Sequence, residues 1–320
     1  MNDIASLSIP VGISACLLGQ KVRFDGGHKR SVYCLNVLSD CFDFKPFCPE
    51  VAAGLGTPRQ PIRLVGDAAD PRALGTRNPD LDATDGLAEH ADFVTEHHPE
   101  LCGYVLMKGS PSCGMERVKV YHPNGMPNEA GSGIFAARLM ANNPALPVEE
   151  EGRLNDAVLR ENFITRVFVY YSWQQEVATD PSVHSIIQFH SRHKYQLMAH
   201  SYKGYKELGR YLAKDAPQQP LDEVMDHYIL TLMTFLKERA NRKSHTNVLM
   251  HIMGYMKKDL DQDTKQDLLT AIEEYRTRKV HLVVPLTLLK HYLKRHGNDY
   301  ILSQAYLDPY PHELGLRNYI

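Results

Sequence analysis

Apolar positions follow two different patterns along the chain, and the change falls near its middle. In the first half, short apolar runs alternate with segments whose apolar residues recur every three or four positions. The runs predict buried strands at 9–14, 42–47 and 104–107, and the periodic segments predict helices at 81–98 and 133–142. Strands that alternate with helices favour an α/β domain with a mostly parallel sheet.

The second half keeps the helical period almost throughout and contains few β-branched runs. Prolines at 181, 217 and 220 mark breaks between helices, because proline cannot continue a helix from within. The expected helices are 154–179, 182–212, 221–239, 243–260, 263–278 and 285–296. This half is therefore predicted to be an all-α bundle.

The boundary between the halves is expected within NNPALPVEEEG at 142–152, where two prolines and three glutamates are typical of a linker or a helix start. Domains are accordingly predicted at 1–150 and 151–320. The net charge is −5 in the first and +3 in the second, and the second holds 14 of the 17 tyrosines. The whole-chain charge of −2 does not by itself indicate a partner.

The overall composition excludes several classes of protein. Hydrophobic residues make up 43% and charged residues 23%, as in an ordinary soluble protein. No apolar run reaches the roughly 20 residues that span a bilayer, and MNDIASLSIP lacks the basic and apolar regions of a secretory signal. A cytoplasmic protein without a membrane partner is expected. In that reducing compartment, six cysteines in 320 residues are more typical of metal-binding or catalytic thiols than of disulfides.

Three of the cysteines lie in turns that directly follow predicted strands. Cys16 stands in SACLLG, Cys48 in FCPE and Cys113 in GSPSCG. Because the carboxyl ends of parallel strands meet at one edge of a sheet, these thiols are expected to converge there. Three thiolates without a fourth fit either a catalytic zinc with an open position or a cubane iron–sulfur cluster whose fourth iron has no protein ligand.

The other cysteines, Cys34, Cys41 and Cys102, lack such a turn and are predicted to be buried as small hydrophobic residues. Ordinary burial remains the alternative for all six. Nearby, Arg23 and Asp25 in VRFDGG are expected to pair within a turn, and direct contact with the substrate is the alternative. Arg59 in the rigid loop PRQP either contacts a phosphate or forms a surface salt bridge.

Three segments together resemble the thiouracil desulfidase family: SACLLGQKVRFDGGH at 14–28, FCPEVAAGLGTPRQP at 47–61 and KGSPSCG at 108–114. The resemblance covers about the first 150 residues. It implies that Cys16, Cys48 and Cys113 bind a [4Fe–4S] cluster with one iron open to the sulfur of a thiocarbonyl substrate. It also implies that Glu50 is the catalytic carboxylate and Ser110 the active-site serine.

The chemistry of these residues agrees with that implication. A thiocarbonyl sulfur is soft and suits iron in a sulfur-ligated cluster, and Glu50 can move protons as a general acid and base. Ser110 and Ser112 can hydrogen-bond a substrate ring or a cluster sulfide. The net change is hydrolytic, because C=S becomes C=O, hydrosulfide leaves and no electron is consumed.

The second half resembles the YbgA-like domain in FHSRHKYQLMAHS, HTNVLMHIMGY, VPLTLLKHY and PYPHELGLRN. Basic residues and tyrosines are interleaved there, as in surfaces that neutralise phosphates and stack unpaired bases. The candidate RNA contacts are Arg192, Lys194, Lys203, Arg239, Arg242 and Lys243. The alternatives are a solvated helix face with core histidines, or a metal site made of His190, His193, His245 and His251.

These features predict an iron–sulfur-dependent desulfidase that converts 4-thiouridine in tRNA to uridine. The fusion supports tRNA, because a free base needs no second domain, and the fused architecture is similar to that of tRNA thiouridine desulfidases. One alternative is a desulfidase of free thiouracil or thionucleotides, with the helical domain serving assembly. Another is a non-catalytic RNA-binding protein with a structural metal.

Overall fold

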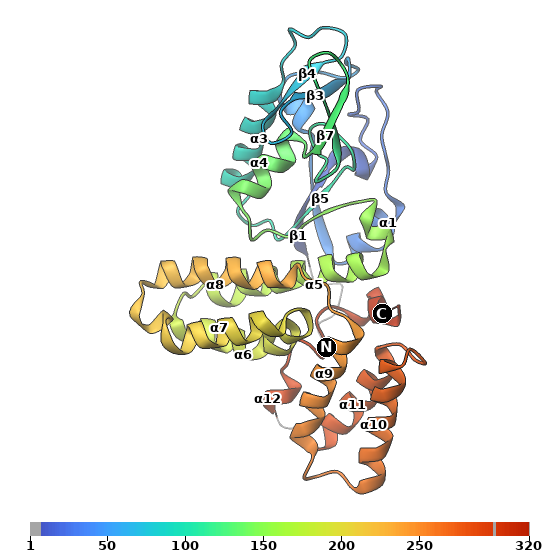
Figure 1. Cartoon of the computed structure of the whole chain (residues 1–320), viewed down its shortest axis with the longest axis vertical. Helices are drawn as coiled ribbons and strands as arrows, with labels where there is room; N and C mark the ends of the chain where they lie inside the picture. Colours follow the sequence, from blue (N-terminus) through green and yellow to red (C-terminus); the bar gives the residue numbers. More distant parts are fainter. Residues whose placement is uncertain (1–7, 297–298, 320) are drawn as a thin grey trace. The chain divides into compact units, whose positions relative to one another are not determined.

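The computed structural model describes residues 8–296 and 299–319. Contacts between residues divide the chain into two units, Met1–Asn155 and Asp156–Ile320, and Figure 1 shows the α/β and helical parts. The segment 142–152 is not the linker or helix start that its prolines and glutamates suggest. It contains strand β8, Val148–Glu150, because Val148 pairs with β5 and the side chains of Glu149 and Glu150 find partners inside the first unit.

The first sheet of this unit is parallel throughout, in the order β2-β1-β5-β8. Strands β1 (Ile9–Ser14) and β2 (Phe42–Phe47) have the predicted bounds, and β5 (Tyr104–Leu106) ends one residue early. The apolar pattern predicts β1 and β5 as strands because every side chain of β5 and nearly every side chain of β1 is buried. Gly12 is required in β1, since a Cβ there would lie 2.3 Å from the ring of Tyr104.

A second sheet was not predicted. It has the order β4-β3-β6-β7, with β3 (Ile62–Gly66) and β6 (Val118–Tyr121) parallel and with antiparallel β4 (Pro71–Gly75) and β7 (Pro127–Gly131) at its edges. Its strands have only four or five residues, and burial alternates or is mixed along β3, β4 and β6, so the apolar pattern is too short to stand out. The α/β class is confirmed, and the mostly parallel character belongs to the first sheet.

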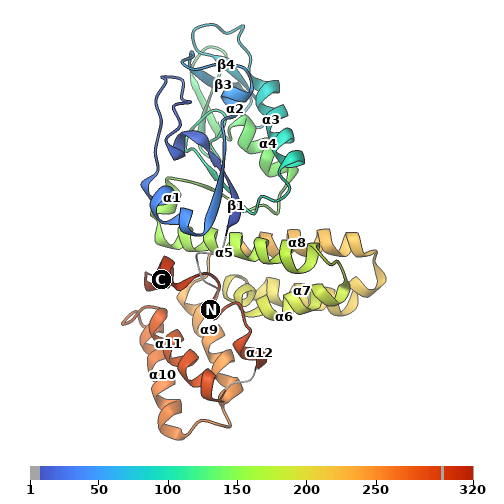
Figure 2. The same cartoon turned by 180° about the vertical axis from the view of Figure 1, so that it is seen from behind.

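The helices of the first unit are α1 (Val32–Asn36), α2 (Pro49–Ala52), α3 (Thr84–His97) and α4 (Ile134–Asn142). Figure 2 shows α3 and α4 side by side near β3 and β4. Leu87 of α3 and Ile134 of α4 pack against Leu64 and Val120 of the second sheet. The two helices therefore bury one face of that sheet.

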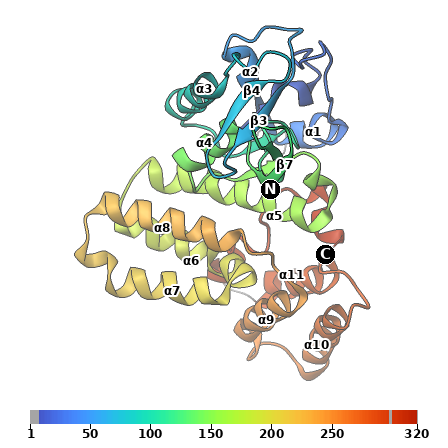
Figure 3. The same cartoon turned by 45° about the horizontal axis from the view of Figure 1, so that its top comes forward.

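The second unit is helical, as predicted. Its helices are α5 (Ala157–Trp173), α6 (Val183–His200), α7 (Tyr202–Lys214), α8 (Leu221–Leu236), α9 (Arg242–Met253), α10 (Gln262–Arg276), α11 (Val283–His296) and α12 (Asp299–Leu302). Figure 3 shows α6, α7 and α8 packed together, with α9, α10 and α11 forming a second group. None of the helices that the structure describes combines the length and the apolarity that crossing a membrane requires.

The helix expected at 182–212 is in fact two helices. Ser201 adopts an extended backbone conformation, with φ −144°, and its hydroxyl accepts a hydrogen bond from the amide of Gly204. This is the geometry of a helix N-cap, so α7 begins anew at Tyr202. The apolar period runs on across the break because α7 also packs against the neighbouring α6.

Candidate active site

The three predicted strand-end cysteines line one cavity of about 220 Å³ in the first unit. Cys16 lies in a 3₁₀ turn directly after β1, Cys48 directly precedes α2, and Cys113 lies in the loop after β5. Strand order reverses between β1 and β5, since β2 lies on one side of β1 and β5 on the other. Such a switch point opens a crevice at the carboxyl edge of a sheet, which is where the cysteines meet.

Two of these thiols are buried, and Cys48 is partly buried. Cys16 and Cys113 are 8% and 6% exposed. Burial raises the pKa of Cys16 to about 11 and that of Cys113 to about 12, and it also raises the pKa of Cys48. Each thiolate would further raise the pKa of its neighbour, since Cys48 acts on both of the others. A cationic group is therefore needed to hold three thiolates here, and soft thiolate ligands favour iron–sulfur clusters or zinc.

A zinc ion and a cubane iron–sulfur cluster need different distances between their cysteine ligands. Within residues 8–296 and 299–319, no three His, Cys, Asp or Glu side chains lie close enough together to hold one metal ion. A single zinc needs every thiolate sulfur at about 2.3 Å from one point. A cubane cluster binds each cysteine through a different iron and so needs its ligands farther apart. Three cysteines around a shared cavity are of the residue type that either group uses as ligands.

Glu50 lies in the first turn of α2, two residues after Cys48, and lines the same cavity. Its Oε1 accepts a hydrogen bond of 2.6 Å from the hydroxyl of Ser112. Its Oε2 accepts from Arg59 Nε at 2.8 Å and lies 2.7 Å from Arg59 Nη2. Arginine thus holds one oxygen of the carboxylate, and the other faces a hydroxyl that can pass a proton.

Arg59 lines the same cavity and pairs with Glu50 there. Its side chain is 5% exposed, so the prediction of a surface salt bridge is wrong, whereas the predicted phosphate contact stays a prediction. Besides Glu50, its guanidinium donates to the carbonyls of Val22 and Gly56, at 2.9 and 2.7 Å. The available signal was an arginine nine residues after a candidate catalytic carboxylate, within a loop rich in glycine and proline.

Ser110 organises the loop that carries Cys113. Its hydroxyl accepts from the amides of Ser112 and Cys113, at 3.2 and 3.1 Å, and lies 2.9 Å from the hydroxyl of Ser112. Ser112 also lies 3.7 Å from the Cys113 sulfur. A chain of hydroxyls therefore connects the loop backbone, the third cysteine and Glu50.

Two of the three glutamates at 149–151 hold the two ends of that loop. Glu151 Oε2 accepts from the amide of Lys108 at 2.7 Å, and Glu150 Oε1 accepts from the amide of Met115 at 3.0 Å. Glu149 pairs with Arg153 at 2.6 Å. The acidic run that suggested a linker is thus part of what fixes the loop position.

The remaining cysteines do not line this cavity. Cys34, Cys41 and Cys102 are at most 1% exposed. They are buried among apolar side chains, in agreement with the prediction that they act as small hydrophobic residues.

In the second unit, the basic candidates differ in their surroundings. Arg242 donates to the carbonyls of Tyr275 and Val280, at 2.7 and 3.1 Å, and Arg192 pairs with Glu176 at 2.7 Å. The ammonium of Lys194 lies over two tyrosine rings. Arg192 is exposed although it is paired, and Lys203, Arg239 and Lys243 are exposed as well. These four residues present charge to solvent, whereas Arg242 is partly buried and bonded to backbone carbonyls.

Three of the four histidines considered for a metal site are packed, as the structural alternative proposed, whereas His251 is exposed. His190 bonds the Tyr228 hydroxyl at 3.0 Å, His193 the carbonyl of Phe189 at 3.0 Å, and His245 the Tyr306 hydroxyl at 2.9 Å. Burial lowers the pKa of His190 to about 4 and that of His193 to about 3. They are neutral at pH 7 and hold core hydrogen bonds.

Comparisons with known proteins cover both units. Residues 11–151 match the family model described as 2-thiouracil desulfurase, and residues 194–311 match DUF1722, a family of unknown function. The protein YbgA of Escherichia coli (strain K12) is 33% identical over 134 residues, which are 42% of this chain and 79% of YbgA. The protein YbbK of Bacillus subtilis (strain 168) is 29% identical over 150 residues, which are 45% of this chain and 97% of YbbK.

Among solved structures, the [4Fe-4S]-dependent thiouracil desulfidase TudS is 31% identical to this chain. The match covers 47% of this chain and 95% of the TudS chain, with a TM-score of 0.36. The relation to TudS therefore rests on the sequence.

Proposed function

Because the chain belongs to the 2-thiouracil desulfurase family in its first unit and to the YbgA-like DUF1722 family in its second, we propose that it converts 4-thiouridine in tRNA to uridine. Family membership makes the first unit a desulfidase domain. The observation that carries the proposal is the hydrogen-bonded series Arg59–Glu50–Ser112, which lies beside three cysteines in one cavity.

The cavity suits the cofactor named for TudS. It contains the thiols of Cys16, Cys48 and Cys113, and its volume of about 220 Å³ far exceeds the roughly 30 Å³ of a water molecule. When bound there, a [4Fe–4S] cluster with three cysteine ligands supplies one iron as a soft Lewis acid for a thiocarbonyl sulfur.

The protein side chains then manage the protons of a hydrolysis. Water adds its oxygen to the ring carbon that carried sulfur, the C–S bond breaks, and hydrosulfide leaves without any transfer of electrons. We assign Glu50 to take a proton from the water through Oε1, with Ser112 as its hydrogen-bonded neighbour. Arg59 keeps the carboxylate in place through Oε2, and Ser110 holds the loop that presents Ser112.

Two features support a substrate with phosphates. Arg23 and Lys108 line the cavity along with the cysteines, and such cations suit a substrate that carries phosphates. In the second unit, Tyr202 is 48% exposed, lies 5.9 Å from Tyr205 and has the ammonium of Lys206 over its ring. Exposed tyrosine faces beside lysines suit unpaired bases in RNA.

Free thiouracil is the second candidate substrate. The name of TudS, which is related in sequence to the first unit alone, describes it as a thiouracil desulfidase. On this alternative the cysteine cavity acts on a free base, and the second unit serves assembly.

The decisive experiment incubates anaerobically reconstituted protein with bulk bacterial tRNA, digests the RNA and quantifies each thionucleoside against uridine. Selective loss of 4-thiouridine, with uridine and sulfide appearing in equal amounts, is the expected result. A parallel incubation supplies free 4-thiouracil and 2-thiouracil at matched concentrations.

Turnover of the free bases with unchanged tRNA would establish the second candidate instead. Protein without iron and acid-labile sulfide after reconstitution would contradict both and favour a non-catalytic role.

A further inference from the structure

A second cavity lies wholly within the helical unit and is larger, at about 470 Å³. One wall is a face of α11, where Thr287, Lys290 and Lys294 recur at spacings of three and four residues. The opposite wall is the C-terminal segment 307–318. We call this the α11 cavity.

The lining of the α11 cavity is basic. It includes Lys290, Lys294 and Arg317, together with His291 and His312, and none of the lining residues that the structure describes is acidic. Asp308 just outside pairs with both Lys290 and His312. Among the described residues, Lys294 and Arg317 form no direct ion pair with a carboxylate, and their charges favour an anion in the cavity.

Arg317 is the most unusual of these residues. Its side chain lies among tyrosines and is only 9% exposed, with its guanidinium 4.8 Å from the ring centre of Tyr306. Nη1 donates to the Tyr306 carbonyl at 2.7 Å, but Nε is buried and has no hydrogen-bond acceptor within the described residues. The negative charge of the buried Glu161 carboxylate favours the charged form of Arg317. The same carboxylate accepts a hydrogen bond of 3.0 Å from the hydroxyl of Tyr310. A buried guanidinium with a donor to spare, in a cavity wall, suits an anionic oxygen.

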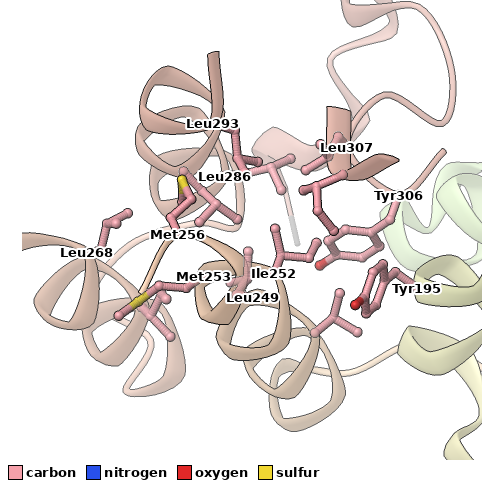
Figure 4. Close-up of a cluster of buried hydrophobic side chains, with 14 of the residues drawn as sticks. Tyr195, Leu249, Ile252, Met253, Met256, Leu268, Leu286, Leu293, Tyr306 and Leu307 are labelled. Carbon is pink, nitrogen blue, oxygen red and sulfur yellow. The ribbon is translucent and has the colours of Figure 1, made fainter. Parts of the chain in front are cut away.

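The base of the α11 cavity is apolar. Leu286, Leu307 and Leu316 line it and are each at most 4% exposed, and Tyr310 joins them. Figure 4 shows Leu286 and Leu307 within the buried cluster that α9, α10 and α11 share with the C-terminal segment. A volume of 470 Å³ is in the range of cavities that hold a small organic ligand. The α11 cavity thus combines cations with an apolar, partly aromatic floor. This combination suits a ligand that carries a phosphate and a flat ring.

We propose that the α11 cavity binds one nucleotide of the RNA substrate. Lys294 and Arg317 would contact the phosphate of that nucleotide, and the three leucines and Tyr310 would contact its nucleobase. The site adds a contact point for RNA that is separate from the basic residues of α6, α7 and α9. The proposal rests on the proposed function, because it takes tRNA as the polyanion.

The test compares two neighbouring positions of α11 in the full-length protein. Lys294→Ala removes a cation from the cavity wall, and Arg295→Ala removes an exposed cation that does not line the cavity. Binding of a fluorescent, unmodified tRNA transcript is measured by anisotropy from about 50 to 200 mM salt, the range over which phosphate contacts lose strength. Circular dichroism checks that each variant is folded.

Lys294→Ala is expected to raise the Kd about 5-fold to 10-fold at the lowest salt and to lower the salt dependence by close to one phosphate contact. Arg295→Ala is expected to change the Kd less than about twofold. Equal effects of the two substitutions, or wild-type affinity in both, would overturn the cavity as an RNA site while leaving the desulfidase proposal intact. Absence of tRNA binding by the unaltered protein would overturn the proposed function and, with it, the nucleotide assigned to this cavity.

Discussion

The cysteine cavity of the first unit and the histidine-rich core of the second both bury side chains that can ionise, but they do so in opposite ways. Around the cavity, Cys16, Cys48 and Cys113 border open space. In the helical core, His193 and His245 each hydrogen-bond a neighbouring group of the protein. A buried polar group that is satisfied within the protein stabilises the fold, whereas a cluster of thiols around a cavity has room for a ligand.

The two regions also differ in how charge is handled. In the core, burial keeps the histidines neutral, which removes the cost of an unpaired charge. Beside the cysteine cavity, Glu50 stays next to Arg59, and this ion pair is held at the cavity wall. The comparison shows why the same residue types indicate chemistry in one unit and packing in the other.

The largest effect on activity is expected from cysteine substitutions. The first unit contains both cavity-lining and fully buried thiols, so the two kinds can be compared within it. Cys16→Ala, Cys48→Ala or Cys113→Ala should abolish iron binding, labile sulfide and desulfuration together, because each removes a ligand at the cavity. Cys34→Ala and Cys102→Ala are the matched controls, since those thiols are buried away from the cavity. They should keep full iron content and lose about 1–2 kcal/mol of stability. Iron and sulfide analysis decides it, and full iron in Cys48→Ala would overturn the ligand assignment.

Glu50→Gln should separate binding of the cluster from catalytic turnover. The amide keeps the shape of the side chain but cannot cycle a proton, so kcat should fall by about 10²-fold to 10⁴-fold. Iron content should match that of the unaltered protein. Glu100→Gln, at an exposed position paired with His98, serves as the control and should retain kcat. An unchanged kcat in Glu50→Gln would contradict the proton-transfer role.

Arg59→Lys is expected to have an intermediate effect. A lysine keeps the charge but cannot donate at once to Glu50 and to the carbonyls of Val22 and Gly56. We expect roughly a tenfold lower kcat with little change in KM, since proper placement of one carboxylate is at stake. Arg59→Met should lower kcat further and cost roughly 2–3 kcal/mol of stability, less than a fully buried pair because the Glu50 side chain is 15% exposed.

The control for Arg59 is Arg138→Lys, which alters an arginine–carboxylate pair with Asp92 on the exposed surface. Its effect on stability should stay below about 1 kcal/mol, and kcat should not change. Steady-state kinetics and thermal unfolding of the four proteins separate a positioning role from a purely structural one, since only the former lowers kcat in Arg59→Lys.

The smallest effect on activity is expected at His193, where the consequence is for stability. Burial lowers the pKa of His193 to about 3, so the unfolded chain binds a proton below about pH 6.5 that the folded unit does not. Stability therefore falls as the pH decreases, by about 2 kcal/mol from this group at pH 5. His193→Asn should remove that part of the pH dependence, because an amide can donate to the Phe189 carbonyl without titrating.

Trp173 reports on this unit during urea unfolding. It is the single tryptophan of the chain and lies 5.3 Å from the ring of Phe189, which stacks on His193. The difference in stability between His193→Asn and the unaltered protein should shrink from pH 7.5 to pH 5. A constant difference would mean that His193 is not held neutral in the folded state.

The sequence was sufficient where one residue and its neighbours in the chain decide the outcome. The apolar runs of β1 and β2 predicted their bounds, because β1 is buried along most of its length and the first two phenylalanines of β2 stand two positions apart, as on one side of a strand. Turns after three such strands predicted the convergence of Cys16, Cys48 and Cys113, since parallel strands share one carboxyl edge. Helical periodicity predicted the second unit as helical, although it did not reveal the N-cap at Ser201.

Only the tertiary structure decided which polar groups meet. The pairing of Arg59 with Glu50, the clamp of Glu150 and Glu151 on the cysteine loop, and the α11 cavity all join segments whose separation in the chain says nothing about their distance. The reason is physical: apolar periodicity records whether a side chain is buried, whereas the partner of a buried charge depends on the path of the whole backbone. The acidic run at 149–151 illustrates this, because Glu149 and Glu150 are buried and accept hydrogen bonds from Arg153 and from the amide of Met115, although the run is typical of a surface linker.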